Sequence, residues 1–202
     1  MLYIVLIILA TLLIALVNIL CNAFGNPWWY SLVASVVATI AVILVDGLVA
    51  TIIRHLPEKW FSHENKCFDV PKKEIKFYEA IGIKKWKDLI PELGGFTNFH
   101  KNHVNEPNNP KYIERFLLEI NYGHVLHFLG VPFGYLIMLL DYGIYMGRGI
   151  TIGLTIGIPV ATVNAILCLL PAFVLRYNYP RLQVMHKFAL RKQSKKNGEF
   201  NE

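Results

Sequence analysis

Four long apolar stretches constrain this chain more than any other feature of its sequence. A helix needs about 20 mainly apolar residues to cross the hydrocarbon core of a bilayer, and the stretches at about 1–20, 31–53, 116–140 and 150–175 reach this length. Hydrophobic residues make up 54% of the 202 residues and charged residues only 17%, against about 25% charged residues in ordinary soluble domains. We therefore predict an all-α integral membrane protein with about four transmembrane helices in a single membrane domain, 1–202.

The same composition excludes two other classes of protein. Disordered chains are polar and highly charged, and the spacing of Cys21, Cys67 and Cys168 does not suggest a disulfide framework. The first apolar stretch lacks the basic start of a signal peptide and exceeds the usual core of about 7–15 residues. We expect this stretch to be a retained membrane anchor.

The distribution of lysine and arginine predicts the orientation of the chain. Twelve of the 20 lie in the connection 54–115 and seven in the basic tail 176–202, whereas the connections 21–30 and 141–149 hold none and one. Positive charge stays on the cytoplasmic side of a membrane. We expect a multi-pass protein of the cell membrane, with both termini and the 54–115 loop in the cytoplasm.

Part of this cytoplasmic loop has the pattern of a basic amphipathic helix, at residues 74–90. Lysines surround a predicted apolar face made of Ile75, Tyr78, Trp86 and Leu89. Such helices lie in the headgroup layer and attract anionic lipids. We expect an interfacial loop that packs on the bilayer and forms the floor of a site open to the cytoplasm.

Four ionisable residues lie within the predicted membrane helices, where an aspartate costs about 2.5–3.5 kcal/mol at mid-helix. These residues are Asp46, Glu119, His124 and His127. A helical rise of 1.5 Å per residue places Asp46 at a depth between Glu119 and His127. A histidine oriented by a carboxylate is a general base, so all four are candidate catalytic residues. The alternative is a polar clamp that only holds helices together.

Two histidine pairs with a spacing of three residues leave a metal-dependent membrane enzyme open as an alternative. The pairs are His100 with His103 and His124 with His127, and imidazoles and carboxylates suit Fe or Zn. Because the denser histidine clusters expected of a di-iron membrane site are missing from this sequence, we predict no metal ligands. A further alternative is a lipid-binding or scaffold protein without catalytic activity.

Several short motifs follow one another in order between about residues 50 and 190. They are 56–61 (LPEKWF), 77–79 (FYE), 83–87 (IKKWK), 176–182 (RYNYPRL), and Glu119 followed eight residues later by His127. In order and spacing they resemble the glycosyl-4,4'-diaponeurosporenoate acyltransferase family, small bacterial membrane enzymes of carotenoid biosynthesis. The motif at 176–182 is the most specific of the set.

This resemblance implies transfer of a fatty acyl group onto a sugar hydroxyl of a glycosylated carotenoid, with His127 and Glu119 as the catalytic pair. It also implies a set of substrate-binding residues: Arg176, Asn178, Arg181, Trp86 and Lys87. His124 stands where the family pattern has an acidic residue. This departure leaves the acceptor open between a carotenoid glucoside and another membrane glycolipid or polyisoprenoid sugar.

The molecules expected around the site follow from this reaction. The partners are membrane lipids, the glycosylated acceptor and the acyl donor, and no nucleic acid is expected. The donor is either acyl-CoA or a phospholipid, and an arginine suits the phosphate of either one. No cofactor is expected besides this donor. Since the sequence shows no nucleophilic serine or cysteine motif, we expect direct transfer without an acyl-enzyme.

Overall fold

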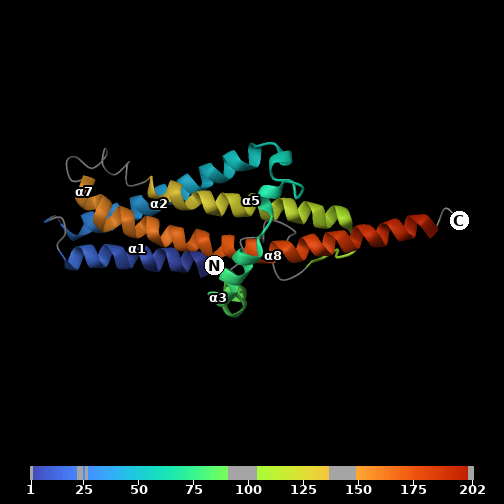
Figure 1. Cartoon of the computed structure of the whole chain (residues 1–202). Coiled ribbons are helices and arrows are strands. Elements are labelled where there is room, and N and C mark those ends of the chain that lie inside the picture. The colour runs from blue at the N-terminus through green and yellow to red at the C-terminus, as the bar shows by residue number, and fades with distance from the viewer. Residues whose placement is uncertain (1, 22–24, 26, 91–103, 137–148, 200–202) are drawn as a thin grey trace. The chain divides into compact units, whose positions relative to one another are not determined.

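The computed structural model describes residues 2–21, 25, 27–90, 104–136 and 149–199 (Figure 1). These residues form helices and turns and include no β-strand, so the all-α class is confirmed. Three helices of this described part are long and apolar enough to cross a membrane. They are Tyr3–Leu20, Trp28–His55 and Ile150–Lys195. The chain is a membrane protein, whereas the count of four spans and the orientation stay predictions.

The chain divides into two compact units, each with its own hydrophobic core. Unit 1 comprises residues 1–53 and 126–169, and unit 2 comprises residues 54–125 and 170–202. The helices α5 (Pro110–Tyr135) and α8 (Ile158–Glu199) each contribute to both units.

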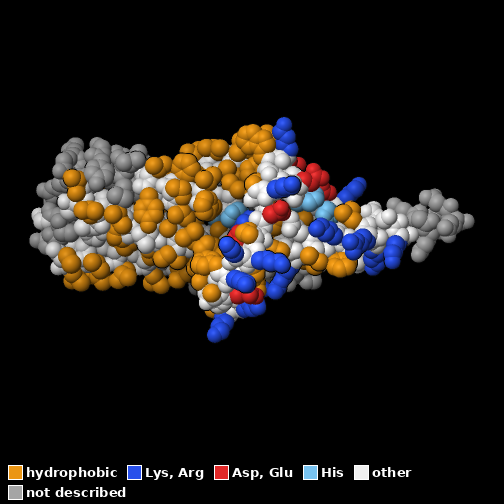
Figure 2. All heavy atoms as spheres, viewed as in Figure 1, with side chains coloured by type: hydrophobic (Ala, Val, Ile, Leu, Met, Phe, Trp, Pro, Cys, Tyr) orange, Lys and Arg blue, Asp and Glu red, His pale blue; other side chains and the backbone are white. Residues whose placement is uncertain are grey.

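Unit 1 is built from α1 (Leu2–Leu20), most of α2 (Trp28–His55), and the chain from α7 (Gly149–Ile152) through the π-turn Gly153–Gly157 into α8. Its core is small and aliphatic: Ala34, Ala38, Val42, Ile152, Ile156 and Val160. Many leucine, isoleucine and valine side chains of α1 and α2 are exposed instead. In Figure 2 hydrophobic side chains cover the visible face of these two helices, as expected of surfaces that face lipid.

A polar contact ties α1 to the π-turn. Proline has no N–H, so Pro159 cannot donate to the carbonyl of Thr155, four residues earlier. The side-chain nitrogen of Asn18 donates a hydrogen bond to this carbonyl oxygen at 2.9 Å. A backbone acceptor inside a bilayer must find a donor within the protein, so α1 completes the hydrogen bonding of the α8 region.

The third predicted span corresponds over most of its length to α5. The helix begins with the Asn109–Pro110 pair, where the Asn109 side chain accepts hydrogen bonds from the backbone nitrogens of Lys111 and Tyr112, as an N-cap does. Charged residues such as Arg115 and Glu119 lie in its first half. Among the described residues, α5 is not one of the helices apolar enough to span a bilayer, and residues 137–140 lie outside them.

In unit 2 the predicted continuous helix over 74–90 is wrong. The structure has α3 (Lys72–Ala80), then the short α4 (Ile83–Trp86) and a 3₁₀ turn, Lys87–Leu89. Gly82 separates the two helices with φ +71°, in the left-handed region that glycine adopts without a Cβ penalty. The glycine therefore separates α3 from α4 and lets the chain change direction between them.

The predicted apolar face of this segment packs on the protein. Tyr78 and Ile83 join Val174 and Tyr177 of α8 in a buried cluster, and Trp86 packs against its edge. Leu89, predicted on the same face, is instead 73% exposed, because the break at Gly82 changes the register. The basic tail predicted from residue 176 is helical through Glu199, where α8 ends.

Candidate functional site

Three of the four predicted catalytic residues lie on α5, with Glu119 and His124 in unit 2 and His127 in unit 1. Their separate surroundings decide which chemistry each side chain is able to perform.

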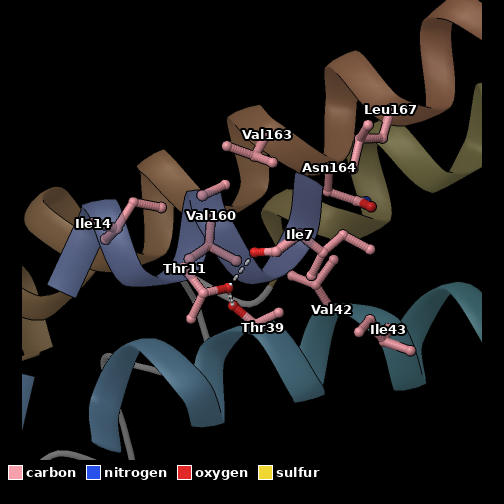
Figure 3. A pocket seen from close by; sticks show the side chains of 11 residues that line it. Ile7, Thr11, Ile14, Thr39, Val42, Ile43, Val160, Val163, Asn164 and Leu167 are labelled. Atoms are coloured by element: carbon pink, nitrogen blue, oxygen red, sulfur yellow. Dashed lines mark hydrogen bonds between the residues drawn. The ribbon is translucent and has the colours of Figure 1, made fainter. Parts of the chain in front are cut away.

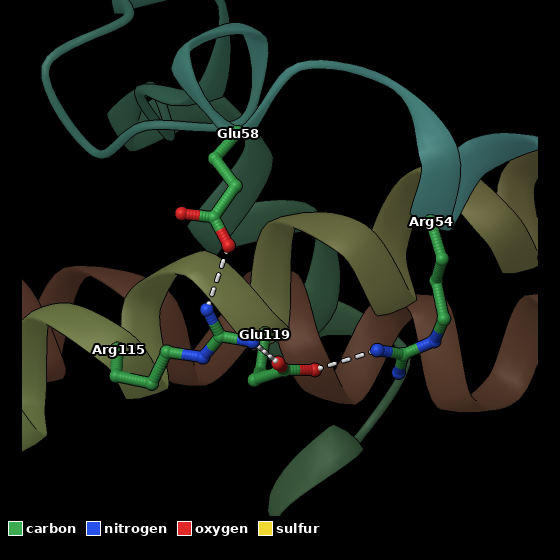
Figure 4. A network of polar contacts seen from close by, with 4 residues as sticks. All are labelled: Arg54, Glu58, Arg115 and Glu119. Atoms are coloured by element: carbon green, nitrogen blue, oxygen red, sulfur yellow. Dashed lines mark hydrogen bonds and ion pairs between the residues drawn. The ribbon is translucent and has the colours of Figure 1, made fainter.

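Glu119 lies at the centre of a charged network in unit 2 (Figure 4). One carboxylate oxygen accepts a hydrogen bond from Arg54 at 3.2 Å, and the other accepts one from Arg115 at 2.8 Å. Arg115 also donates to Glu58 at 2.8 Å. The Glu119 side chain is only 11% exposed, whereas both arginine side chains are about half exposed. Two guanidinium groups thus bind both oxygens of the Glu119 carboxylate.

His127 has different surroundings, in the part of α5 that belongs to unit 1. Its Nδ1 atom is buried and has no hydrogen-bond partner among the described residues. Buried polar atoms are normally hydrogen-bonded, so an imidazole nitrogen without a partner is unusual. Among the described residues, no group competes for this nitrogen.

Asp46 of α2 lies in a polar cluster within unit 1. Its carboxylate accepts a hydrogen bond from the Asn164 side chain at 3.4 Å and lies 3.9 Å from the Cys168 thiol. Asn164 also donates to the carbonyl oxygen of Gly130, three residues after His127. The Asp46 carboxylate therefore packs against α5 about one helical turn from His127.

Two glycines of α5 make room for this cluster. A Cβ atom at Gly130 would lie 3.0 Å from the Cys168 sulfur, and one at Gly134 would lie 2.8 Å from the Asn164 side-chain nitrogen. Small residues allow such close approach between membrane helices. The sequence contains Asn164, Cys168 and both glycines, but their spacing along separate helices gives no signal that they surround Asp46.

Arg176, predicted to bind substrate, forms a dense set of contacts within unit 2. Its guanidinium donates to both carboxylate oxygens of Glu74, at 2.8 and 2.7 Å. It also donates to the backbone carbonyls of Phe68, at 2.8 Å, and Asp69, at 3.3 Å. A bidentate arginine–carboxylate pair is strong and directional. Arg176 therefore anchors the segment 68–74 to α8.

Glu74 receives further support from its neighbours. Burial alone would raise its pKa, but the hydrogen bonds from Arg176 and Tyr78 and the charge of Arg176 lower the pKa of Glu74 below its ordinary value. His124 is close enough to contribute to this lowering. Burial, followed by the hydrogen bond to Glu74 at 2.6 Å, raises the pKa of Tyr78. His124 is thus associated with the Glu74–Arg176 pair.

The other predicted substrate-binding residues lie at different places in unit 2. The guanidinium of Arg181 lies 5.3 Å from the ring centre of Tyr177 and is exposed, while Asn178 is half-buried on α8. Trp86 donates its indole N–H to the carbonyl of Ile81 at 3.0 Å. Lys87 begins the 3₁₀ turn after α4 and is half-buried.

The described residues show no metal cluster, and unit 1 contains a small cavity. The described residues include no group of three or more histidine, cysteine, aspartate or glutamate side chains able to hold a metal ion, and His100 and His103 lie outside these residues. A cavity of about 30 Å³ lies between α1, α2 and α8, beside the Thr11–Thr39 hydrogen bond (Figure 3). This volume suits about one water molecule.

Three helices long and apolar enough to cross a membrane define the class of protein, a helical membrane protein. Residues 57–187 match the family model described as glycosyl-4,4'-diaponeurosporenoate acyltransferase. The chain belongs to this family, and it is an acyltransferase. No curated protein and no solved structure matches the chain. The matched range includes Glu119, His127 and the 176–182 motif, and it leaves out Asp46.

Proposed function

We propose that this protein transfers a fatty acyl group from an activated donor to a sugar hydroxyl of a glycosylated membrane lipid, with His127 as the general base. Membership of the acyltransferase family supports the reaction type, and the family name refers to a glycosylated carotenoid acid as acceptor. The spanning helices support a lipid substrate. The place of His127 in unit 1, about one helical turn from the Asp46 cluster, is the observation that carries the choice of base.

The proposed step moves one proton and exchanges one bond. His127 accepts the proton of the sugar hydroxyl as its oxygen attacks the donor carbonyl carbon. The new C–O ester bond forms, the bond from the acyl carbon to the leaving group breaks, and the imidazolium returns the proton to that leaving group. A positioned general base contributes about 10²–10⁴-fold to such a reaction.

The two carboxylates take different parts in this proposal. Asp46 of α2 shares unit 1 with His127, and its carboxylate packs against α5 about one helical turn from His127. Its charge is therefore better placed than that of Glu119 to stabilise an imidazolium. Glu119 is bound by two arginines, and it serves as a positioning residue that fixes the start of α5 against Arg54. His124 is proposed as a neighbour of the Glu74–Arg176 pair and not as a second base.

The exposed side of the 72–90 segment is proposed to lie on the bilayer surface. The predicted apolar face packs on α8, but Phe77, Ile81 and Leu89 remain exposed at 51%, 40% and 73%. Exposed lysines flank them, among them Lys76 and Lys85. Apolar side chains surrounded by lysines suit an anionic headgroup layer.

A mass-spectrometric assay tests the proposed function. The purified protein is incubated with a long-chain acyl donor and a panel of glucosylated lipids, including a carotenoid glucoside. We expect one class of acceptor to gain the mass of one acyl group. If no acceptor gains mass with either acyl-CoA or phospholipid as donor, while the protein stays helical and monodisperse, the proposed function is wrong.

A further inference from the structure

The last part of α8 contains a groove that the proposed reaction has not used. It lies within unit 2 and has a volume of about 480 Å³, which is within the range of small-molecule sites. Its principal lining residues are Asn108, Arg181, Val184, Met185, Phe188 and Lys192.

The groove combines two cations with an apolar centre. Arg181 and Lys192 are 11 residues apart, which is about 16 Å along a helix and within about 20° of the same face. Between them Val184 and Phe188 remain 52% and 62% exposed. Among the described residues, no carboxylate lines the groove. Its surface therefore suits an elongated, anionic molecule with an apolar or aromatic part.

The state of the two cations favours a ligand over a structural role. Arg181 forms no ion pair within 4.0 Å among the described residues. The nearby Glu79, which feels its charge, is paired with Lys84 at 2.7 Å. Lys192 donates to the side-chain oxygen of Asn108 at 3.1 Å, which leaves two of its three N–H donors free. Both heads are thus able to receive phosphate oxygens.

We propose that this groove binds the coenzyme A part of an acyl-CoA donor. The proposal rests on the proposed acyl transfer, which requires an activated acyl group. Coenzyme A carries several phosphate charges near an adenine ring, so Arg181 and Lys192 bind the phosphates while Phe188 contacts the ring or the pantetheine arm. Arginine binds phosphate in a bidentate manner, and lysine binds it as a point charge.

Charge complementarity favours acyl-CoA over a phospholipid. A phospholipid headgroup offers a single phosphodiester, which one cation satisfies. Two cations, Arg181 and Lys192, line the groove, and together they match a ligand with several negative charges. Arg181 and Lys192 both line the groove, so an elongated polyphosphate is able to contact both cations.

Binding of free coenzyme A to the full-length protein in zwitterionic nanodiscs tests this assignment without turnover. By calorimetry we expect Arg181→Ala and Lys192→Ala each to raise the dissociation constant about fivefold or more, and Arg181→Lys to raise it less. Coenzyme A lacking its 3'-phosphate should bind more weakly than the complete molecule. The double variant Lys187→Ala with Arg191→Ala removes two exposed cations of α8 outside the groove, and it should bind within about twofold of the wild type.

The outcomes separate this assignment from the proposed function. His127→Ala should bind coenzyme A as the wild type does, even if it transfers no acyl group. Unchanged binding in Arg181→Ala and Lys192→Ala, or no binding by folded wild-type protein, overturns the assignment. If the protein instead acylates a glycolipid from a phospholipid donor and ignores coenzyme A, the acyl transfer stands and the groove assignment is wrong.

Discussion

Arg176 and Arg181 begin and nearly end one sequence motif, yet their contacts give them different roles. Arg176 is bound to Glu74 and to two backbone carbonyls, whereas Arg181 faces the groove on α8. The motif identified both residues as important but could not assign their roles. Glu74 lies 102 residues before Arg176, and no local pattern in a single sequence pairs the two.

The Glu74–Arg176 pair makes the stability of unit 2 depend on pH. Glu74→Gln leaves the largely buried guanidinium without its charge partner, so we expect a loss of about 2 kcal/mol, below the roughly 3–5 kcal/mol of a fully buried pair. The pKa of Glu74 is lowered in the folded protein. Its contribution is therefore complete above the ordinary glutamate pKa of about 4.3 and is lost as the pH falls through the lower folded value.

Thermal unfolding in detergent at pH 7 and at successively lower pH measures this effect. The wild type should lose stability on acidification, and Glu74→Gln should lose less because the titrating pair is already broken. Glu79→Gln is the matched control, since the Glu79–Lys84 pair is largely exposed and surface pairs contribute little. Equal acid sensitivity of wild type and Glu74→Gln would contradict this account.

At the scale of the helices, the contact between α1 and the π-turn couples the effects of substitutions at Asn18 and Pro159. Asn18→Leu should destabilise the protein by about 1 kcal/mol, a usual size for a polar contact between membrane helices, because the Thr155 carbonyl loses its donor. In an Asn18→Leu, Pro159→Ala double variant the new alanine N–H can donate to this carbonyl instead. We expect the second substitution to recover part of the loss, measured by unfolding of all four proteins of the cycle. Strictly additive effects would show that the two residues act independently.

Replacing a glycine of α5 and a glycine of α2 by alanine should change the stability in opposite directions. Gly134→Ala should destabilise unit 1, since its Cβ would lie 2.8 Å from the Asn164 side-chain nitrogen. Gly47→Ala has no atom within 4 Å of its new Cβ and should be neutral or stabilising by up to about 1 kcal/mol, because alanine favours helix. Measured thermal stabilities in the reverse order would refute the close packing around Asp46.

The helices that a single sequence predicts well are those with one strong signal. The long apolar runs of α1 and α2 predict both helices, because nothing but length and apolarity is needed. The structure of the segment 74–90 is harder to predict, since Gly82 inside a helical pattern is compatible with either a helix or a turn. The π-turn at Gly153–Gly157 and its contact with Asn18 depend on packing between distant segments, which no periodicity shows.

For the whole molecule, two native cysteines report the orientation. Cys21 follows α1 and Cys67 follows α2, and both are exposed, while Cys168 is buried. If α2 spans the membrane with the 54–115 loop inside, an impermeant maleimide should label Cys21 in intact cells and Cys67 only in inverted vesicles. Cys21→Ser and Cys67→Ser variants assign each signal. Labelling of both cysteines from one side would refute the predicted span of α2.

The central claim is that an acyltransferase of this family uses His127 as its base. The most direct measurement is the rate of acyl transfer by His127→Ala relative to the wild type, at equal amounts of folded protein and saturating donor, with His63→Ala as a histidine control outside α5. We predict a fall of kcat of about 10²-fold or more with unchanged thermal stability, and near-normal activity in the control. A His127→Ala protein that turns over at the wild-type rate would contradict the account.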